Sequence, residues 1–171
     1  MMTIDIESMA IEMPVVAGHP NREAFRGVLT MLDVASERPP SGSRGHRVVL
    51  MRRAAEAALP SLLGMALDYS PTLDRHDVRR KVGIITRADI ADRKVELGGY
   101  LFAKDFPEIV REIERSGREP NPGLGMSYEV TDTRVADMRA RVWTLTHVTF
   151  TGAAILRRDR AAYPETWIEL E

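Results

Sequence analysis

The stretch LGMSYEVTDTRV (residues 124–135) is followed two residues later by MRARVWTLTHVTFTGAAIL (residues 138–156). Both alternate at period two and are rich in β-branched and aromatic residues, which is the pattern of β-strands. The segments GIIT (residues 83–86) and HVTF (residues 147–150) are apolar enough to be central strands. The sequence therefore predicts a sheet in which residues 83–86 and 147–150 belong to central strands.

The earlier part of the chain contains further strand patterns. A hairpin is indicated by two apolar segments that flank the short stretch ADR. The apolar-rich segment EAFRGVLTMLDV (residues 23–34) also predicts a strand, although its pattern fits a helix too. The predicted strands cover residues 23–34, 46–51, 81–90 and 94–103.

Two segments predict helices between these strands. Residues 52–59 are strong helix formers that stop before Pro60. Residues 105–117 begin with Asp105 as an N-cap and Glu108 as its capping-box partner, followed by an apolar stripe of Ile109, Val110 and Ile113. The element order predicts an α+β fold, with a mostly antiparallel β-barrel or strongly bent sheet surrounded by helices.

Composition excludes several classes of function. Of 171 residues, 44% are hydrophobic and 29% charged, with a formal net charge of -1, so neither nucleic acid nor an anionic membrane is an expected partner. The chain has no cysteine, which excludes disulfides, a thiol nucleophile and cysteine-based zinc sites. No secretory signal and no apolar run near the ~20 residues of a membrane span are found. We expect one cytoplasmic domain.

The sequence lacks the common metal, phosphate and hydrolase motifs. The i, i+4 spacing of a zinc-binding helix does not occur among His19, His46, His76 and His147. The GLG stretch precedes a strand pattern, not the helix N-terminus of a phosphate loop. Gly125 stands two residues before Ser127, but Glu129 replaces the second glycine of G-x-S-x-G. We therefore expect no metal and no cofactor.

A serine–histidine pair is the chemistry that remains. A serine hydroxyl needs a base within hydrogen-bond reach, and that base needs a third group to orient it. His76 lies in a polar loop, and His147 lies in a strand, where period two places it on the face of Trp143 and Leu145. Ser127 and Glu129 share a strand face. The same residues also fit a solvated loop histidine, a packed strand histidine and an ordinary strand serine.

Four segments resemble the prohead (capsid maturation) serine proteases of tailed bacteriophages. They are LPSLLGMALDYSPTLDRHDVRRKVGIIT, GGYLFAKDFPEIVREI, LGMSYEV and VTFTGAAIL, and the similarity covers residues 25–163. That family is related in fold to the herpesvirus assemblins, which have a β-barrel ringed by helices. The resemblance implies an assemblin-like fold for a single protease domain of residues 1–171, with its core at about residues 25–163.

The resemblance also implies residue roles. His76 becomes the general base and Ser127 the nucleophile. The order of residues in assemblins makes His147 the third member, while related phage enzymes use an acid, for which Glu129 and Asp77 are the local alternatives. The pair Arg157 and Arg158 corresponds to an Arg-Arg pair that helps to form the oxyanion hole. His76 lies in a longer loop than in many relatives, so we expect substrate or assembly to order it.

The implied function is cleavage of scaffold protein and major capsid protein, and of the chain itself, inside the immature procapsid in the host cytoplasm. A homo-oligomer is expected, because assemblins dimerise to order their active site. The alternatives are a catalytically inactive scaffolding or structural component of the procapsid, and a β-rich binding module from the host. The loop at residues 35–45 is predicted to be an exposed linker, or else a self-cleavage or substrate-contact segment. Gly123 and Gly125 are interpreted as room for substrate.

Overall fold

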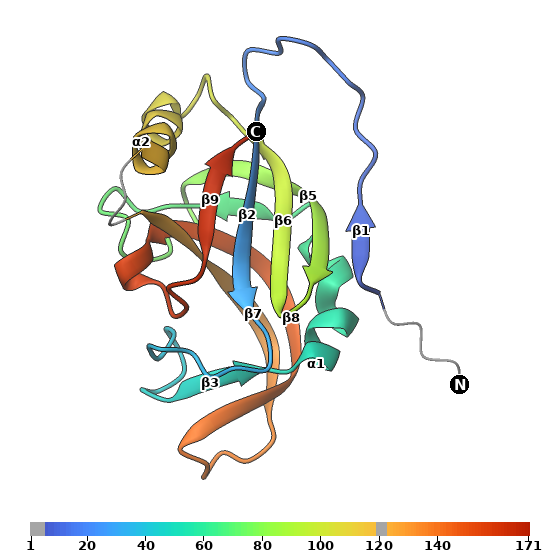
Figure 1. Cartoon of the computed structure of the whole chain (residues 1–171), viewed down its shortest axis with the longest axis vertical. Coiled ribbons are helices and arrows are strands. Elements are labelled where there is room, and N and C mark those ends of the chain that lie inside the picture. Colours follow the sequence, from blue (N-terminus) through green and yellow to red (C-terminus); the bar gives the residue numbers. More distant parts are fainter. Residues whose placement is uncertain (1–5, 119–122) are drawn as a thin grey trace.

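The computed structural model describes residues 6–118 and 123–171, which form an α+β fold around a strongly curled, open sheet (Figure 1). Within the described residues, nine strands join this sheet: β1 Ser8–Ala10, β2 Glu23–Met31, β3 Arg47–Leu50, β4 Ala66–Asp68, β5 Lys81–Ala91, β6 Lys94–Leu101, β7 Leu124–Val135, β8 Val142–Arg157 and β9 Trp167–Leu170. The strands predicted from the alternating segments are therefore confirmed, with small differences at their ends.

The sheet has the order β3-β8-β4-β5-β6-β2-β9, with β1 paired to β5 and β7 paired to β8. Most pairs are antiparallel, and the exceptions are the parallel pairs β3–β8 and β4–β8. The 16-residue β8 is long enough to pair with β3 along its first part and with β4 along its last part. The expected bent, mostly antiparallel sheet is confirmed, and the sheet is an open half-barrel.

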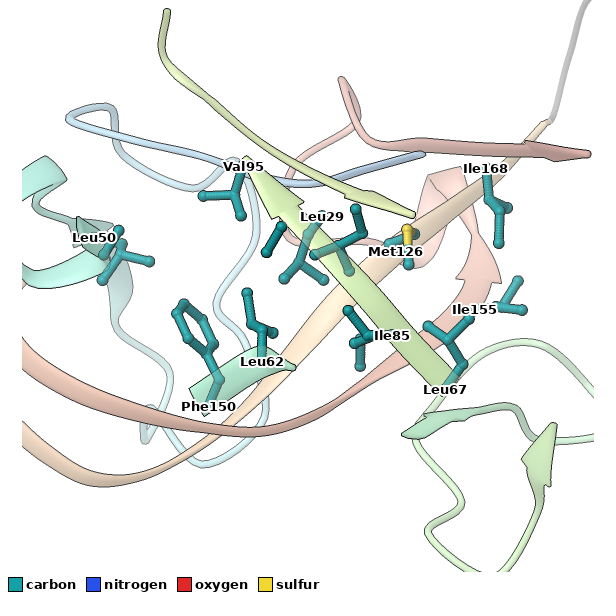
Figure 2. Close-up of a cluster of buried hydrophobic side chains, with 14 of the residues drawn as sticks. Leu29, Leu50, Leu62, Leu67, Ile85, Val95, Met126, Phe150, Ile155 and Ile168 are labelled. Carbon is teal, nitrogen blue, oxygen red and sulfur yellow. The ribbon is translucent and has the colours of Figure 1, made fainter. Parts of the chain in front are cut away.

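The core lies on the inner side of this half-barrel. Leu29, Leu67, Ile85 and Met126 come from four different strands and converge there (Figure 2). Each is at most 1% exposed, so these side chains are removed almost completely from water. Burial of a side chain of this size contributes about 1.5–3 kcal/mol of transfer free energy. The core thus fixes the inner faces of β4 and β7, the two strands that carry Asp68, Ser127 and Glu129 of the candidate site.

The two α-helices cover separate parts of the sheet. Helix α1 (Arg52–Ala58) ends before Pro60, as predicted, and Pro60 lies in the 3-10 turn η1 (Leu59–Leu62) that follows. Helix α2 (Pro107–Arg118) buries Ile109 and Ile113, which confirms its predicted apolar stripe. Neither helix is long and apolar enough to cross a membrane, as judged over the described residues.

The predicted capping box of α2 is wrong. The helix begins at Pro107, one position later than an Asp105 cap would require. The Asp105 carboxylate instead accepts a hydrogen bond from the Asn21 side chain, and the Glu108 carboxylate accepts one from the Tyr69 hydroxyl. Partners that are distant in sequence therefore replace the local hydrogen bonds.

Candidate functional site

Ser127 and Asp68 are brought together by their shared neighbour Ala154. On one side of β8, Ser127 of β7 pairs with Ala154, and on the other side Asp68 of β4 pairs with the same residue. The neighbouring Gly152 faces Glu129 in the register of β7 and β8. A Cβ atom at Gly152 would lie 2.9 Å from Glu129 Oε2 and 3.2 Å from the Ala66 carbonyl oxygen. The small residues of β8 therefore leave room for a carboxylate at this place.

His76 lies between Ser127 and Glu129. Its Nε2 atom is 3.1 Å from Ser127 Oγ, and its Nδ1 atom is 2.7 Å from Glu129 Oε1. With the ring proton on Nδ1, the imidazole donates to the carboxylate and accepts from the serine hydroxyl. The side chains of His76 and Glu129 are 23% and 19% exposed, so the pair is sheltered but open to solvent on one side.

The loop that carries His76 is tied down on both sides of the imidazole. The Leu73 carbonyl accepts a hydrogen bond of 2.7 Å from the Arg157 amide, and the Asp77 amide donates one of 2.9 Å to Asp68 Oδ1. Before the histidine, the side chains of Ser70 and Thr72 both donate to Asp74. The single chain thus places the imidazole at Ser127 with its own bonds, contrary to the expectation that substrate or assembly has to order the loop.

Asp68 is a member of the site that the sequence analysis missed. It is only 3% exposed, and its carboxyl hydrogen-bonds Glu129 as well as the Asp77 amide. Burial, followed by the interaction with Glu129, raises the pKa of Asp68 to about 7. A protonated Asp68 can donate to the Glu129 carboxylate. The available signal in the sequence is that Asp68 directly follows the apolar run LLGMAL (residues 62–67). Its partner Glu129, however, lies on a strand far along the chain.

Glu129 is held as a carboxylate by its neighbours. The hydrogen bond from His76 is the main cause that lowers the pKa of Glu129, and the hydrogen bond from Asp68 acts in the same direction against the effect of burial. An ionised acid next to the imidazole favours the tautomer that leaves Nε2 free to accept the serine proton. The arrangement is a line of four side chains: Asp68, Glu129, His76 and Ser127.

His147 lies elsewhere on the sheet. It is exposed and pairs with Arg134, and it is not among the residues that bond His76 in the described part of the chain. The expectation that it shares a face with Trp143 and Leu145 is wrong, because those two are buried and His147 is not. An extra residue, Thr146, shifts the register of β8 here and inverts the alternation.

The Asp77 carboxylate also bonds residues other than His76. Its carboxylate accepts a hydrogen bond from the Arg79 amide and forms an ion pair of 3.4 Å with Arg80. Its contribution to the site is the backbone amide that holds Asp68. Of the proposed acids, the structure therefore brings Glu129 to the imidazole.

The backbone amides of Arg157 and Arg158 are both used inside the fold. The Arg157 amide donates to the Leu73 carbonyl, and the Arg158 amide donates to the Gly123 carbonyl at 2.9 Å. In this conformation neither is free to bind an oxyanion, which differs from the expected role. Arg157 instead anchors the loop of His76.

The space near Gly125 is filled by the protein. A Cβ atom at Gly125 would lie 2.6 Å from Thr166 Oγ1, and that hydroxyl oxygen accepts a hydrogen bond of 3.0 Å from the Met126 amide. The interpretation of this glycine as room for substrate is therefore wrong. Close approach of Thr166 to β7 explains why no side chain is present there.

A pocket of about 770 Å³ opens beside Ser127. Its lining comes from β7, from the His76 loop and from residues of the predicted linker, including Ser43 and Arg44. Ser43 is buried, and its hydroxyl contacts the carbonyls of Pro40 and His46. The linker at residues 35–45 is thus a folded wall of the pocket.

The site offers two kinds of chemistry. The line from Glu129 through His76 to Ser127 can activate a hydroxyl nucleophile. In addition, Asp68, His76 and Glu129 each offer one potential metal-ligand atom, and these atoms lie within 4.8 Å of one another, close enough to share a cation. Since those carboxylates and the imidazole already bond one another, a cation would have to displace these hydrogen bonds.

No protein-family model matches the chain, and no curated protein matches it. The geometry of the site is therefore the main support for any function assigned to the chain.

Proposed function

We propose that the chain is a serine endopeptidase of the prohead-protease type, with an assemblin-like version of the half-barrel fold. The observation that carries this proposal is the alignment of His76 between Ser127 Oγ, at 3.1 Å, and Glu129 Oε1, at 2.7 Å. An imidazole bonded on one side to a serine hydroxyl and on the other to a carboxylate is the arrangement used for acyl transfer.

In the proposed reaction, His76 Nε2 takes the Ser127 proton as Ser127 Oγ attacks the scissile carbonyl. Glu129 keeps the proton on Nδ1 and stabilises the imidazolium that forms. Asp68 positions Glu129 by donating to it. His76 then gives its proton to the leaving amine. Water attacks the acyl-enzyme as His76 Nε2 takes its proton, and His76 returns that proton to Ser127 Oγ as the acyl bond breaks.

The proposed substrates are the cognate scaffold and major capsid proteins, and the chain itself, inside an immature procapsid in the host cytoplasm. A homo-oligomer is part of this proposal. Assembly is relevant to Arg157 and Arg158 because their backbone amides are the expected donors of the oxyanion hole. An oxyanion needs donors about 2.7–3.1 Å from its position. The Arg157 amide is bonded to the Leu73 carbonyl, so it can serve only if assembly breaks that bond while the bond between the Asp77 amide and Asp68 still holds His76 at Ser127.

A second candidate is an inactive structural component of the procapsid that keeps the protease fold. The occupied amides of Arg157 and Arg158 favour it, because a serine without an oxyanion hole is a weak catalyst. This candidate predicts that Ser127 can be replaced without consequence for the processing of capsid proteins.

The test combines the full chain with its cognate scaffold and capsid proteins during assembly. Parent, Ser127→Ala and Ser8→Ala chains are compared, Ser8 being a control serine on β1 that bonds Asp89. The proposal expects cleavage with the parent and with Ser8→Ala, and none with Ser127→Ala. Equal cleavage by all three chains removes Ser127 from the mechanism, and no cleavage by any supports the structural component.

A further inference from the structure

The pocket beside Ser127 has an apolar floor. Val48 of β3, Trp143 and Leu145 of β8 and Val135 of β7 line it together. Val48, Leu145 and Trp143 are 2%, 4% and 7% exposed, so the floor is set firmly into the sheet. Trp143 is held by stacking on His46, with ring centroids 4.3 Å apart, and by donating a hydrogen bond to the Met138 carbonyl.

The mouth of the pocket is cationic. Arg44 comes from the folded linker and Arg75 from the residue before the base, and both side chains line the pocket from exposed positions. Among the described residues neither guanidinium forms an ion pair within 4.0 Å, whereas the carboxylate that lines the pocket, Glu129, is bonded to His76. The two guanidinium groups outnumber the one carboxylate of the lining, so the net charge at this mouth is positive, although the Asp74 carboxylate beside Arg75 offsets part of it.

We propose that this pocket is a substrate subsite for a large apolar side chain, such as Leu, Met or Phe, of a polypeptide that is acidic next to that side chain. The proposal rests on the proposed function, because the subsite is defined by its position beside Ser127. The apolar floor favours burial of carbon, and the two arginines favour carboxylates at the rim. A volume of about 770 Å³ leaves room for the apolar side chain and part of the flanking chain.

The same features reject other peptides. A lysine or arginine in the pocket would be desolvated against an apolar floor that offers it no free carboxylate, and flanking lysines would meet Arg44 and Arg75. A peptide with alanine in place of leucine leaves the floor unfilled. Loss of a single methylene in an apolar pocket costs about 10–200-fold in selectivity, so loss of most of a leucine side chain costs at least tenfold.

Trp143 makes the test independent of catalysis. The full-length Ser127→Ala chain is titrated with three octapeptides, and tryptophan fluorescence is recorded. One peptide has a central Leu flanked by Glu, the second replaces Leu with Ala, and the third replaces the Glu residues with Lys. Trp167 lies apart from this pocket and lines a hollow with Arg26 and Glu169, and a Trp143→Phe version of the chain shows which signal belongs to the pocket.

The expected result is a Trp143 signal with the Leu–Glu peptide and a Kd at least tenfold lower than for either other peptide. Arg44→Glu should raise the Kd of that peptide and lower the Kd of the Lys-flanked peptide. Met138→Asp, at a rim residue that is 51% exposed and far less able to disturb folding than a floor residue, should weaken the Leu–Glu peptide at least threefold. Equal affinity for all three peptides, or tighter binding of the Lys-flanked one, overturns the proposal.

Binding and catalysis fail separately in this design. If Ser127→Ala binds as expected while the parent cleaves no protein, the pocket stands as a binding site for an apolar, acid-flanked peptide and the proposed endopeptidase falls. If the parent cleaves its cognate proteins but cut sites show neither an apolar side chain nor neighbouring acids, the endopeptidase stands and the subsite falls.

Discussion

The imidazole of His76 lies 3.1 Å from the hydroxyl of Ser127, although 51 positions separate the two residues in the chain. The contact joins a loop to the strand β7, and it forms because the loop is anchored at Leu73 and Asp77 by bonds to Arg157 and Asp68. The hydrogen-bonded line continues through Glu129 to Asp68. Single substitutions can test each link of this line and the strands that support it.

Replacement of Glu129 should remove most of the activity. Glu129→Gln keeps the shape of the side chain but takes away the charge that fixes the His76 tautomer, so kcat should fall by about 10³–10⁴-fold. The measurement is the rate of cleavage of cognate capsid protein. His147→Ala is the matched control, because His147 is exposed and stands opposite Arg134, and it should change kcat less than twofold. A large loss of kcat with His147→Ala and none with Glu129→Gln would instead make His147 the third catalytic residue, as in assemblins.

Asp68 should give the activity an upper pH limit. Because its pKa is raised to about 7, it donates to Glu129 below that pH and becomes a second negative charge above it. Asp68→Asn can donate from its amide at every pH, so its kcat should decline less than that of the parent between pH 7 and 9. Asp68→Ala should lose activity at all pH values. Identical pH–rate profiles for the parent and Asp68→Asn would show that Asp68 does not position Glu129.

The same group should affect stability with a defined sign. A carboxyl whose folded pKa is raised binds more protons folded than unfolded, so its contribution to stability is present below about pH 4 and is lost as pH rises through about 7. Asp68→Asn should remove this loss. Between pH 4 and 8, the free energy of unfolding of the parent should fall relative to the variant by on the order of 4 kcal/mol, measured by urea unfolding. A relative rise with pH would contradict the assignment.

Gly152→Ala should displace the Glu129 carboxylate. The added methyl carbon would lie 2.9 Å from Glu129 Oε2 and 3.2 Å from the carbonyl of Ala66, so a side chain or strand has to move. We expect a loss of about 1–3 kcal/mol in unfolding free energy and at least a tenfold loss in kcat at temperatures where the variant is folded. Gly117→Ala in α2 meets no atom within 4 Å and should be neutral or slightly stabilising. Unchanged activity of Gly152→Ala would show that the carboxylate position is unimportant.

Thr166→Val should weaken the support of β7. The Thr166 side chain is fully buried, accepts from the Met126 amide and donates to the Tyr163 carbonyl. Valine leaves a buried amide without its partner, at a cost of about 1–3 kcal/mol in urea unfolding. Thr131→Val, on the exposed part of the same strand, should change stability by less than about 0.5 kcal/mol. Equal effects of the two would show that this hydrogen bond carries little free energy.

Local pattern was sufficient to predict most of the fold. Period-two alternation predicts β7 and β8, and helix formers ending at Pro60 predict α1, because these signals come from neighbouring residues. The capping box fails because Asn21 and Tyr69, both distant in sequence, take the side chains of Asp105 and Glu108. Periodicity alone has no means of weighing such tertiary partners.

The candidate site was less accessible to sequence reasoning. The sequence offers His76 and Ser127 as a candidate pair, but their roles follow only from the resemblance, which leaves Glu129 as an alternative to His147. A bulge at Thr146 turns His147 outward, and a bulge of one residue leaves no clear mark in a strand pattern. Asp68 was missed because its role depends on β4 and β7 pairing with opposite edges of β8 at Ala154. That arrangement exists only in the folded sheet.

Covalent labelling by a fluorophosphonate probe tests the nucleophilic role of Ser127 most directly, with the modified residue located by mass spectrometry in assembled particles. We expect a label on Ser127 of the parent chain, a labelling rate at least 100-fold lower for His76→Ala, and no label at this position for Ser127→Ala. An unlabelled Ser127 in the parent, or labelling that is as fast without the His76 imidazole, would contradict that role.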